Sequence, residues 1–369
     1  MPVFFEGWEK KILPVLPARV WRTYLGGREL ERWLGAPAPR DGEFPEVWVA
    51  STVRSRNPND TAGDEGLSMV PLENGMAVSL EEVLQSNPAA FLGDEHWLKY
   101  GGNPGVLVKM IDSLSRLMIQ VHPDREYAKK VFASDYGKTE AWYILGGRRT
   151  GGEDPYVLLG FKPGITRPKW EQLFADQDVA GLIDSLHKVY VKPGEVYYIA
   201  AGVPHAIGAG CFLAEIQEPT DYTIRMERQT PEGKPLPDIL IHQGAGFDRI
   251  FDCFSYQTAT LAETIRQWRV APRELNRAAG GRETVLLGKE HTRLFGMHQV
   301  DVNSEFDTGT AASCTIVIVL SGSGFAEFPG SALQVKASSL LFVPASLGPV
   351  RWRADMDADL KILRCFPPT

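Results

Sequence analysis

Cysteine is scarce in this chain, with four residues among 369 and no C-x-x-C pair. The four thiols are Cys211, Cys253, Cys314 and Cys365, and they lie far apart in the sequence. This spacing argues against a disulfide framework and against a zinc site built from thiolates. Reduced thiols are typical of a cytoplasmic protein, and we expect that location.

Long apolar runs and an excess of positive charge are also missing. No run of about 18 apolar residues occurs, so the sequence offers no candidate for a membrane-spanning helix. Residues 1–11 hold no apolar stretch long enough for a signal peptide. The 46 acidic and 39 basic residues give a net charge of −7. A sequence-independent nucleic-acid binder needs a basic surface, so no nucleic-acid partner is expected.

What is present is typical of a globular protein with many short strands. Hydrophobic residues make up 44% of the chain, and 36 Gly and 26 Pro are dispersed along it. This pattern favours strands joined by turns. A length of 369 residues predicts two domains. We place them at residues 1–250 and 251–369.

One segment departs from the strand pattern. Between Arg167 and Val189 the apolar residues recur at helical spacing, as in Pro168–Phe174 and Val179–Leu186. We predict a helical insert around residues 167–189, with the strand pattern resuming at Val189.

The two domains contain an internal echo. Residues 192–205 align with residues 336–349 at a constant offset of 144, and the apolar positions match. Residues 315–324 likewise resemble residues 142–147. Two β-barrels of the same type explain the echo economically. Pro349 stands at the position of His205, so the second barrel is predicted to lack the metal ligands of the first.

The chemistry-bearing residues lie in the first barrel. Gln120 and His122 are two apart, so on a strand both side chains leave the same face, and Lys138 and Glu140 follow the same rule. With His205, two imidazoles and one carboxylate form a three-ligand set for a borderline divalent metal, leaving room for water or substrate.

Each of these residues also has an ordinary structural interpretation. A single histidine such as His122 is more often a satisfied core residue than a ligand, and His205 alone could be a turn residue. Glu140, however, would point into an apolar barrel, where an unpaired carboxylate costs several kcal/mol unless a metal binds it. Gln120 is open between a ligand and a hydrogen-bonding role, because an amide oxygen is a weak zinc ligand.

Other polar residues are candidates for substrate contacts. Residues 214–225 carry polar side chains at alternating positions, and Arg225 is suited to a phosphate or a developing anion; exposed loop charges are the alternative. Lys109 and Asp112 could be a buried pair or substrate contacts. The remaining histidines have no partner at ligand spacing and are predicted to have surface or packing roles: His96, His187, His242, His291 and His298.

These motifs resemble those of the type I mannose-6-phosphate isomerases (phosphomannose isomerases), in the cupin superfamily. The resemblance lies in Gln120-Val-His-Pro-Asp124, Gly137-Lys-Thr-Glu140, Gly202-Val-Pro-His-Ala206 and the segment from Glu215 to Arg225. It covers residues 17–250 closely and the second barrel more loosely. It implies a mainly β fold of two cupin (jelly-roll) barrels with a small helical insert.

The resemblance also implies a function. The family interconverts mannose 6-phosphate and fructose 6-phosphate through a cis-enediol, with one bound Zn²⁺ per chain. By matching motif, Gln120, His122, Glu140 and His205 resemble the zinc ligands, and Lys138 resembles the lysine proposed for proton transfer. The residues that resemble those around the substrate pocket are Glu215, Asp221 and Arg225.

Three departures affect the expected substrate. The family usually has Ser two residues before the Gln, whereas this chain has Met118, which shares the face of Gln120 and His122. Its Ser-Asp becomes Thr220-Asp221, and Arg225 is followed by Met-Glu-Arg rather than by a usual family continuation. The hypotheses are therefore a zinc-dependent aldose–ketose isomerase acting on mannose 6-phosphate, an isomerase of another sugar or sugar phosphate, a non-catalytic metal- or sugar-binding cupin, and a metal-dependent oxygenase.

Overall fold

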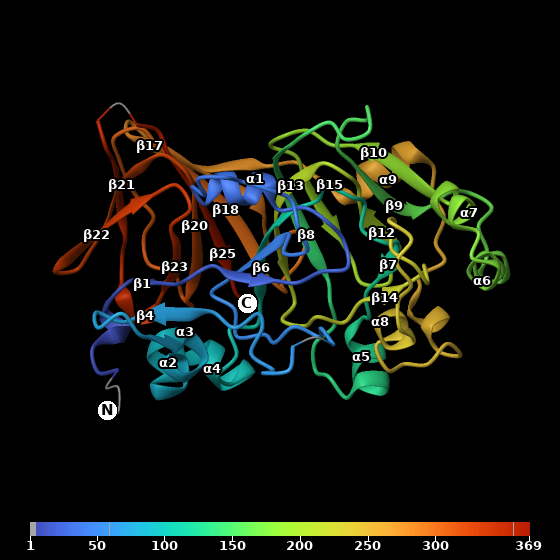
Figure 1. The fold of residues 1–369 in the computed structure, drawn as a ribbon. Coiled ribbons are helices and arrows are strands. Elements are labelled where there is room, and N and C mark those ends of the chain that lie inside the picture. Colours follow the sequence, from blue (N-terminus) through green and yellow to red (C-terminus); the bar gives the residue numbers. More distant parts are fainter. Residues whose placement is uncertain (1–4, 59, 357) are drawn as a thin grey trace.

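The computed structural model describes residues 5–58, 60–356 and 358–369. It is mainly β, with two barrels side by side, as predicted (Figure 1). The barrel drawn mainly in green and yellow is formed mostly by the first two-thirds of the chain, and the one drawn mainly in orange and red mostly by the last third (Figure 1). The first four residues of the predicted domain 1–250 lie outside the described residues.

Two sheets form the first barrel. The larger contains, in spatial order, β15 (Arg269–Val270), β11 (Val196–Ile199), β8 (Glu140–Gly147), β13 (Cys211–Gln217), β6 (Leu107–Asp112), β3 (Glu46–Val49) and β2 (Ala18–Val20). The smaller contains β10 (Leu186–Tyr190), β9 (Tyr156–Phe161), β12 (His205–Ile207), β7 (Gln120–Val121) and β14 (Ile224–Arg225).

The second barrel repeats this plan. Its larger sheet contains β1 (Leu13–Pro14), β23 (Leu340–Val343), β20 (Thr315–Ser321), β25 (Leu360–Phe366), β18 (Gly296–Val302), β17 (Gly281–Leu287) and β16 (Arg273–Ala278). Its smaller sheet contains β19 (Glu305–Asp307), β24 (Arg351–Ala354), β21 (Ser323–Phe328) and β22 (Ser331–Lys336). A separate hairpin joins β4 (Met69–Pro71) and β5 (Ala77–Ser79).

The helices lie outside the barrels (Figure 1). They are α1 (Arg28–Trp33), α2 (Leu80–Ser86), α3 (Pro88–Leu92), α4 (Asp94–Tyr100), α5 (Arg125–Phe132), α6 (Arg167–Asp176), α7 (Val179–Asp184), α8 (Asp238–His242) and α9 (Leu261–Trp268), with short 3-10 turns at Trp8–Lys10, Ile250–Cys253 and Ala345–Leu347. In the part of the chain that the structure describes, every helix falls short of the length and apolar character that crossing a bilayer requires.

The helical insert ends earlier than the sequence suggests. Helices α6 and α7 cover residues 167–184, but β10 begins at Leu186 rather than at Val189 and pairs with β9. Leu182, Leu186 and Val189 are spaced as on one helix face, which extends the helical pattern into the strand. Long-range pairing with β9 overrides that local signal.

The largest core cluster joins the two barrels. It includes Val108 and Ala214 from the larger sheet of the first barrel and Met297 and Leu363 from the larger sheet of the second. Strand β1, near the N-terminus, pairs with β23 of the second barrel, while β15 pairs with β11 of the first. The chain therefore crosses between the barrels at both places, and a division at residue 250 stays a prediction.

Strand alternation places the chemistry inside the first barrel. On β9, Leu158 packs with the insert residue Trp170 on the outer side, whereas Leu159 packs with Trp142 of the opposite sheet. His205 is the partner of Leu159 in the β9–β12 ladder, so its side chain points to the same inner side.

Candidate metal centre and adjoining pocket

Three side chains that could hold a metal ion converge between the two sheets of the first barrel. Glu140 begins β8 in the larger sheet, His205 begins β12 in the smaller sheet, and His122 follows β7 directly. Their potential ligand atoms all lie within 4.8 Å of one another. The three residues are 0 to 1% exposed.

The orientation of both imidazoles is fixed by backbone carbonyls. His122 Nδ1 donates to the carbonyl of Tyr222 at 3.0 Å, and His205 Nδ1 donates to the carbonyl of Val203 at 2.9 Å. A neutral imidazole that donates from Nδ1 has a lone pair on Nε2. This arrangement is the one that commonly orients a metal-binding histidine.

The two Nε2 atoms face the carboxylate of Glu140. His122 Nε2 lies 3.1 Å from Glu140 Oε2, and His205 Nε2 lies 3.2 Å from Glu140 Oε1. Both oxygens of Glu140 are buried without a hydrogen-bond partner of suitable geometry. Lone pairs on two nitrogens and two oxygens thus face one another, an arrangement that a shared cation would stabilise. The donor set fits a divalent metal.

Gln120 adjoins this cluster. It pairs with His205 in the β7–β12 ladder, and its Nε2 lies 3.2 Å from His205 Nε2. Half a turn of the amide would present its oxygen to the cluster instead of its nitrogen. The position is compatible with both roles considered for Gln120, that of a ligand and that of a hydrogen-bonding neighbour.

Lys138 is the cation nearest to the cluster. Its Nζ lies 2.8 Å from His122 Nε2 and 3.2 Å from Glu140 Oε2. Burial lowers the pKa of Lys138, Glu140 raises it, Lys109 lowers it, and the result is a lowered value. Burial and the charge of Lys138 lower the pKa of His122 to about 3, so His122 is neutral near pH 7 and can act as a ligand.

Glu140 remains ionised in this environment. Burial raises its pKa, but Lys138, His122 and His205 together hold the pKa well below its usual range. Glu140 therefore contributes an ionised carboxylate to the set of donors.

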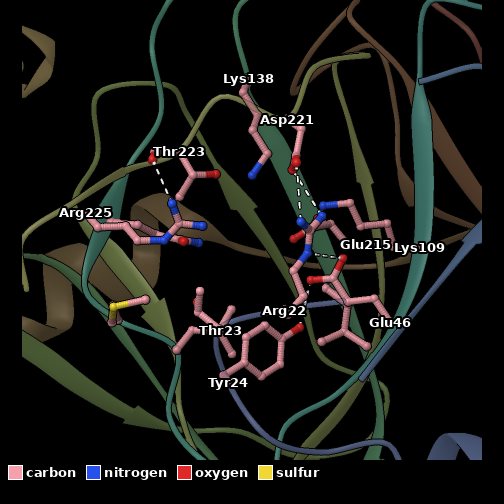
Figure 2. Close-up of a pocket in the computed structure, with 14 residues that line it drawn as sticks. Arg22, Thr23, Tyr24, Glu46, Lys109, Lys138, Glu215, Asp221, Thr223 and Arg225 are labelled. Carbon is pink, nitrogen blue, oxygen red and sulfur yellow. Dashed lines mark hydrogen bonds and ion pairs between the residues drawn. The ribbon is translucent and has the colours of Figure 1, made fainter. Parts of the chain in front are cut away.

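A pocket lined by charged side chains adjoins the cluster (Figure 2). Arg225 lies on one side of this pocket, and Arg22, Glu46 and Lys109 lie on the other. Met118 and Gln120 both line it, which agrees with their predicted common face. The charged residues of the lining are Arg22, Glu46, Lys109, Lys138, Glu215, Asp221 and Arg225.

Most of these charges are paired. Lys109 Nζ lies 2.9 Å from Glu215 Oε1, and Arg22 bridges Glu46 at 3.0 Å and Asp221 at 3.1 Å. Burial raises the pKa of Asp221, but the positive charges of Arg22 and Lys109 outweigh this effect and lower the pKa to about 2. The carboxylate of Asp221 therefore stays charged over the whole range in which enzymes work.

Arg225 differs from the other cations of the pocket. Its Nη1 donates to the carbonyls of Thr223 and Leu240, and among the described residues no carboxylate forms an ion pair with it. Burial lowers the pKa of Arg225 to about 10, although the charge of Asp221 opposes this. A charged guanidinium without a protein counter-ion can receive an anionic group of a ligand.

The structure brings together most of the residues selected from the sequence. Lys109 pairs with Glu215 rather than with Asp112, so the suggested Lys109–Asp112 pair is wrong. Asp112 instead accepts hydrogen bonds from the backbone N–H groups of Gly27 and Glu29 and anchors the start of α1. Its side chain points away from the pocket because Asp112 is three positions from Lys109 on β6, and odd spacings on a strand put side chains on opposite faces.

Three residues of the hydrogen-bonded and ion-paired network in the pocket were missed. They are Arg22, Tyr24 and Glu46, of which Tyr24 donates to Glu46 Oε1 at 2.8 Å. Glu46 had a usable signal, since it is a charged residue in a strongly apolar strand. Arg22 had none, because its partner Asp221 lies 199 positions away.

Comparisons with known proteins show which structures this fold resembles. No family model matches the chain. In structure, it resembles the mannose 6-phosphate isomerase of Bacillus subtilis, with a TM-score of 0.71 and 22% identity over 96% of this chain and 99% of that one. A mutant of phosphomannose isomerase from Salmonella typhimurium gives a TM-score of 0.73 at 17% identity, over 97% and 100% of the two chains. The chain therefore shares the fold of these proteins.

Proteins of similar sequence are mannose-6-phosphate isomerases by name. ManA of Bacillus subtilis (strain 168), a mannose-6-phosphate isomerase, is 30% identical over 247 residues, 63% of this chain and 64% of that protein. The mannose-6-phosphate isomerase of Streptococcus mutans is 30% identical over 201 residues, 51% and 60% of the two chains. A putative mannose-6-phosphate isomerase of Bacillus subtilis, YvyI, is 24% identical over 91% and 93%.

In fold and in part of its sequence, the chain is thus similar to mannose-6-phosphate isomerases. It spans 60 to 64% of the length of the first three curated relatives.

Proposed function

We propose that this protein is a zinc-dependent aldose–ketose isomerase that interconverts mannose 6-phosphate and fructose 6-phosphate. One observation carries the proposal: Gln120 and Lys138, which contact a buried His–Glu–His cluster, line a pocket that also holds Arg225. Among the described residues, no carboxylate forms an ion pair with Arg225. The names of the sequence relatives agree with this activity.

The metal ligands in this proposal are His122, Glu140 and His205, with Gln120 as the fourth. Imidazole nitrogens and a carboxylate oxygen are the usual ligands of catalytic zinc, which keeps a position open for water or substrate. When bound, the ion would polarise the substrate oxygens and stabilise the negative charge that develops on them.

Lys138 is assigned the proton transfer between C1 and C2 of the open-chain sugar. Interconversion of an aldose and a ketose removes a proton from one of these carbons and returns it to the other, by way of a cis-enediol. A group that does this must change its protonation state near neutral pH. The lowered pKa of Lys138 and its position on the pocket wall suit that task.

Binding of the sugar phosphate is assigned to the charged lining. Arg225 would receive an anionic oxygen, either of the phosphate or of the reacting carbon chain, because it has no carboxylate partner among the described residues. Lys109, Glu215 and Asp221 would contact the sugar hydroxyls or keep the cations in place. Their ion pairs hold these side chains at the pocket wall before substrate arrives.

Met118 favours a second candidate, an isomerase of another sugar or sugar phosphate. Its thioether lines the pocket beside Gln120, where a hydroxyl would offer the sugar a hydrogen bond. A purely metal-binding cupin is less well supported, since it has no need of Lys138 within 2.8 Å of a metal-binding imidazole.

The test is a coupled assay of mannose 6-phosphate turnover with the purified chain, before and after chelation, followed by zinc addition. We expect turnover, its loss with chelator and its recovery with zinc. Parallel assays with other aldose phosphates test the second candidate, which predicts higher kcat/KM for one of them. Tight zinc binding without turnover of any aldose or ketose phosphate would refute both.

A further inference from the structure

The two larger sheets correspond strand by strand. The order β11-β8-β13-β6-β3 in the first barrel matches β23-β20-β25-β18-β17 in the second. The registers agree as well: Val196 and Tyr143, paired between β11 and β8, take the positions of Leu340 and Ile318, paired between β23 and β20. Positions on the two sheets can therefore be matched residue by residue.

This matching relates a polar cluster of the second barrel to the pocket of the first. Lys109 lies opposite Glu215 between β6 and β13, and His298 lies opposite Arg364 at the same register between β18 and β25. Both pairs lie on the sheet face that points into the barrel. His298 therefore occupies the position of Lys109, and Arg364 that of Glu215.

A third position agrees. Glu46 lies two residues before the β3 residue that pairs with Lys109, and Glu283 lies two residues before the β17 residue that pairs with His298. The second barrel thus has a Glu, a His and an Arg where the first barrel has three charged pocket residues. At the register of the proposed ligand Glu140, the second barrel has Thr315.

The cluster is tightly bonded. Glu283 Oε1 accepts hydrogen bonds from His298 Nδ1 and from Arg364 Nη1, each at 2.8 Å. The side chains of Glu283 and Arg364 are 7 and 8% exposed, whereas that of His298 is 20% exposed. Phe366 packs against both His298 and Arg364, with its ring 4.7 Å from the His298 ring and 5.0 Å from Arg364 Cζ.

His298 forms part of the wall of a cavity of about 400 Å³. This volume suits a small organic molecule. Basic side chains outnumber acidic ones on the wall. The basic residues are Arg273, Lys289 and His298, and the acidic residue is Glu290. Most of the remaining wall is apolar: Leu275, Val285, Leu287, Phe295, Phe366 and Pro367.

We propose that this cavity is a second ligand site, which binds a small carboxylic acid with an apolar body and needs no metal. The apolar walls would bury the body of the ligand. His298, which donates from Nδ1 to Glu283, would donate from Nε2 to the carboxylate of the ligand. The proposal is independent of the isomerase assignment.

The test measures binding of benzoate to the full chain by isothermal titration calorimetry. Benzamide keeps the apolar ring without the charge, and acetate keeps the charge without the ring. We expect benzoate to bind at least tenfold more tightly than either compound, because the ring and the carboxylate each contribute. Equal binding of benzoate and benzamide would overturn the assignment of a carboxylate.

Substitutions locate the site. His298→Asn should weaken benzoate binding by about tenfold, the typical effect of losing a hydrogen bond to a charged group. The matched control His291→Asn should leave it unchanged, since His291 is not part of the cavity wall. Arg225→Gln should also leave it unchanged; a loss in this variant would mean that benzoate binds in the first barrel and would overturn the proposal.

A variant at an exposed position distinguishes loss of binding from loss of folding. Leu275 is 48% exposed on β16, so Leu275→Asp should fold normally. Its carboxylate would repel the carboxylate of benzoate and shorten the apolar wall, and we expect at least tenfold weaker binding. Benzoate affinity that is unchanged in both Leu275→Asp and His298→Asn would refute the site.

Discussion

Glu140→Gln tests the metal centre through stability as well as activity. The substitution keeps the shape of the side chain and removes the charge that faces two imidazole nitrogens at 3.1 and 3.2 Å. Without metal, the loss of the contact with Lys138 is offset by the removal of a buried charge, so the unliganded variant should remain folded. The main effect should be on metal-dependent stability.

The size of this effect follows from binding linkage. At a free zinc concentration about a hundredfold above the dissociation constant, binding adds about 2.7 kcal/mol to the stability of the native state. For 369 residues unfolding together, the unfolding entropy is about 0.8 kcal/mol/K. Chelation should therefore lower the Tm of the native chain by about 3–4 °C, and it should leave the Tm of Glu140→Gln unchanged.

The assay is thermal unfolding with and without chelator, accompanied by metal analysis and turnover of mannose 6-phosphate. Glu215→Gln is the matched control, since it removes another buried carboxylate of the same pocket, 3% exposed, outside the proposed ligand set. This control should keep both the bound metal and the chelator-dependent shift. The reasoning is refuted if Glu140→Gln retains full activity or the same shift as the native chain.

Three further predictions follow from the buried charges. Lys138→Ala should lower kcat by about 10²-fold or more while zinc content stays the same; parallel loss of zinc would contradict a purely catalytic role. Arg116→Met should cost about 3–5 kcal/mol in urea denaturation, because Glu227, 2% exposed and bonded to Arg116 at 2.7 and 2.8 Å, loses its counter-charge; a cost below about 1 kcal/mol would count against this. Asp221 has a folded pKa of about 2, below its unfolded value, so its pairing with Arg22 stabilises the fold above about pH 4 and is lost as the pH falls toward 2. Asp221→Asn should lose less stability than the native chain between pH 5 and pH 2, and equal losses would argue against this pairing.

The metal cluster was predictable because its signals are local. Gln120 and His122 share a strand face, and Glu140 begins a strand with Lys138 two residues before it. A spacing of two residues on a strand fixes which side chains point the same way, whatever the rest of the fold does. The structure confirms that His122, Glu140 and His205 meet; their role as ligands stays a prediction.

The neighbours of the cluster were harder to predict because they depend on long-range pairing. Arg22 reaches the pocket by pairing with Asp221, and β1 joins the second barrel through β23. Neither contact has a periodic signal in the sequence. The same reason explains the early start of β10, where helical spacing continues into a strand that only its pairing with β9 defines.

The internal echo predicted that the second barrel has the same fold as the first, but it did not predict which residues point into that barrel. A fixed offset matches β11 with β23, yet it cannot match the other strands, since the loops between them differ in length. Glu140 corresponds to Thr315, and Val196 corresponds to Leu340. The number of sequence positions between the two members differs from one pair to the other. Sequence alignment at one offset therefore left His298 without a partner, and a surface or packing role was the natural prediction for it. Sheet register removes the dependence on loop length, because strands in the same order carry equivalent positions into the barrel. By that criterion, the second barrel carries Glu283, His298 and Arg364 at the positions of three charged pocket residues of the first barrel, so it differs in the identity of these inner polar residues.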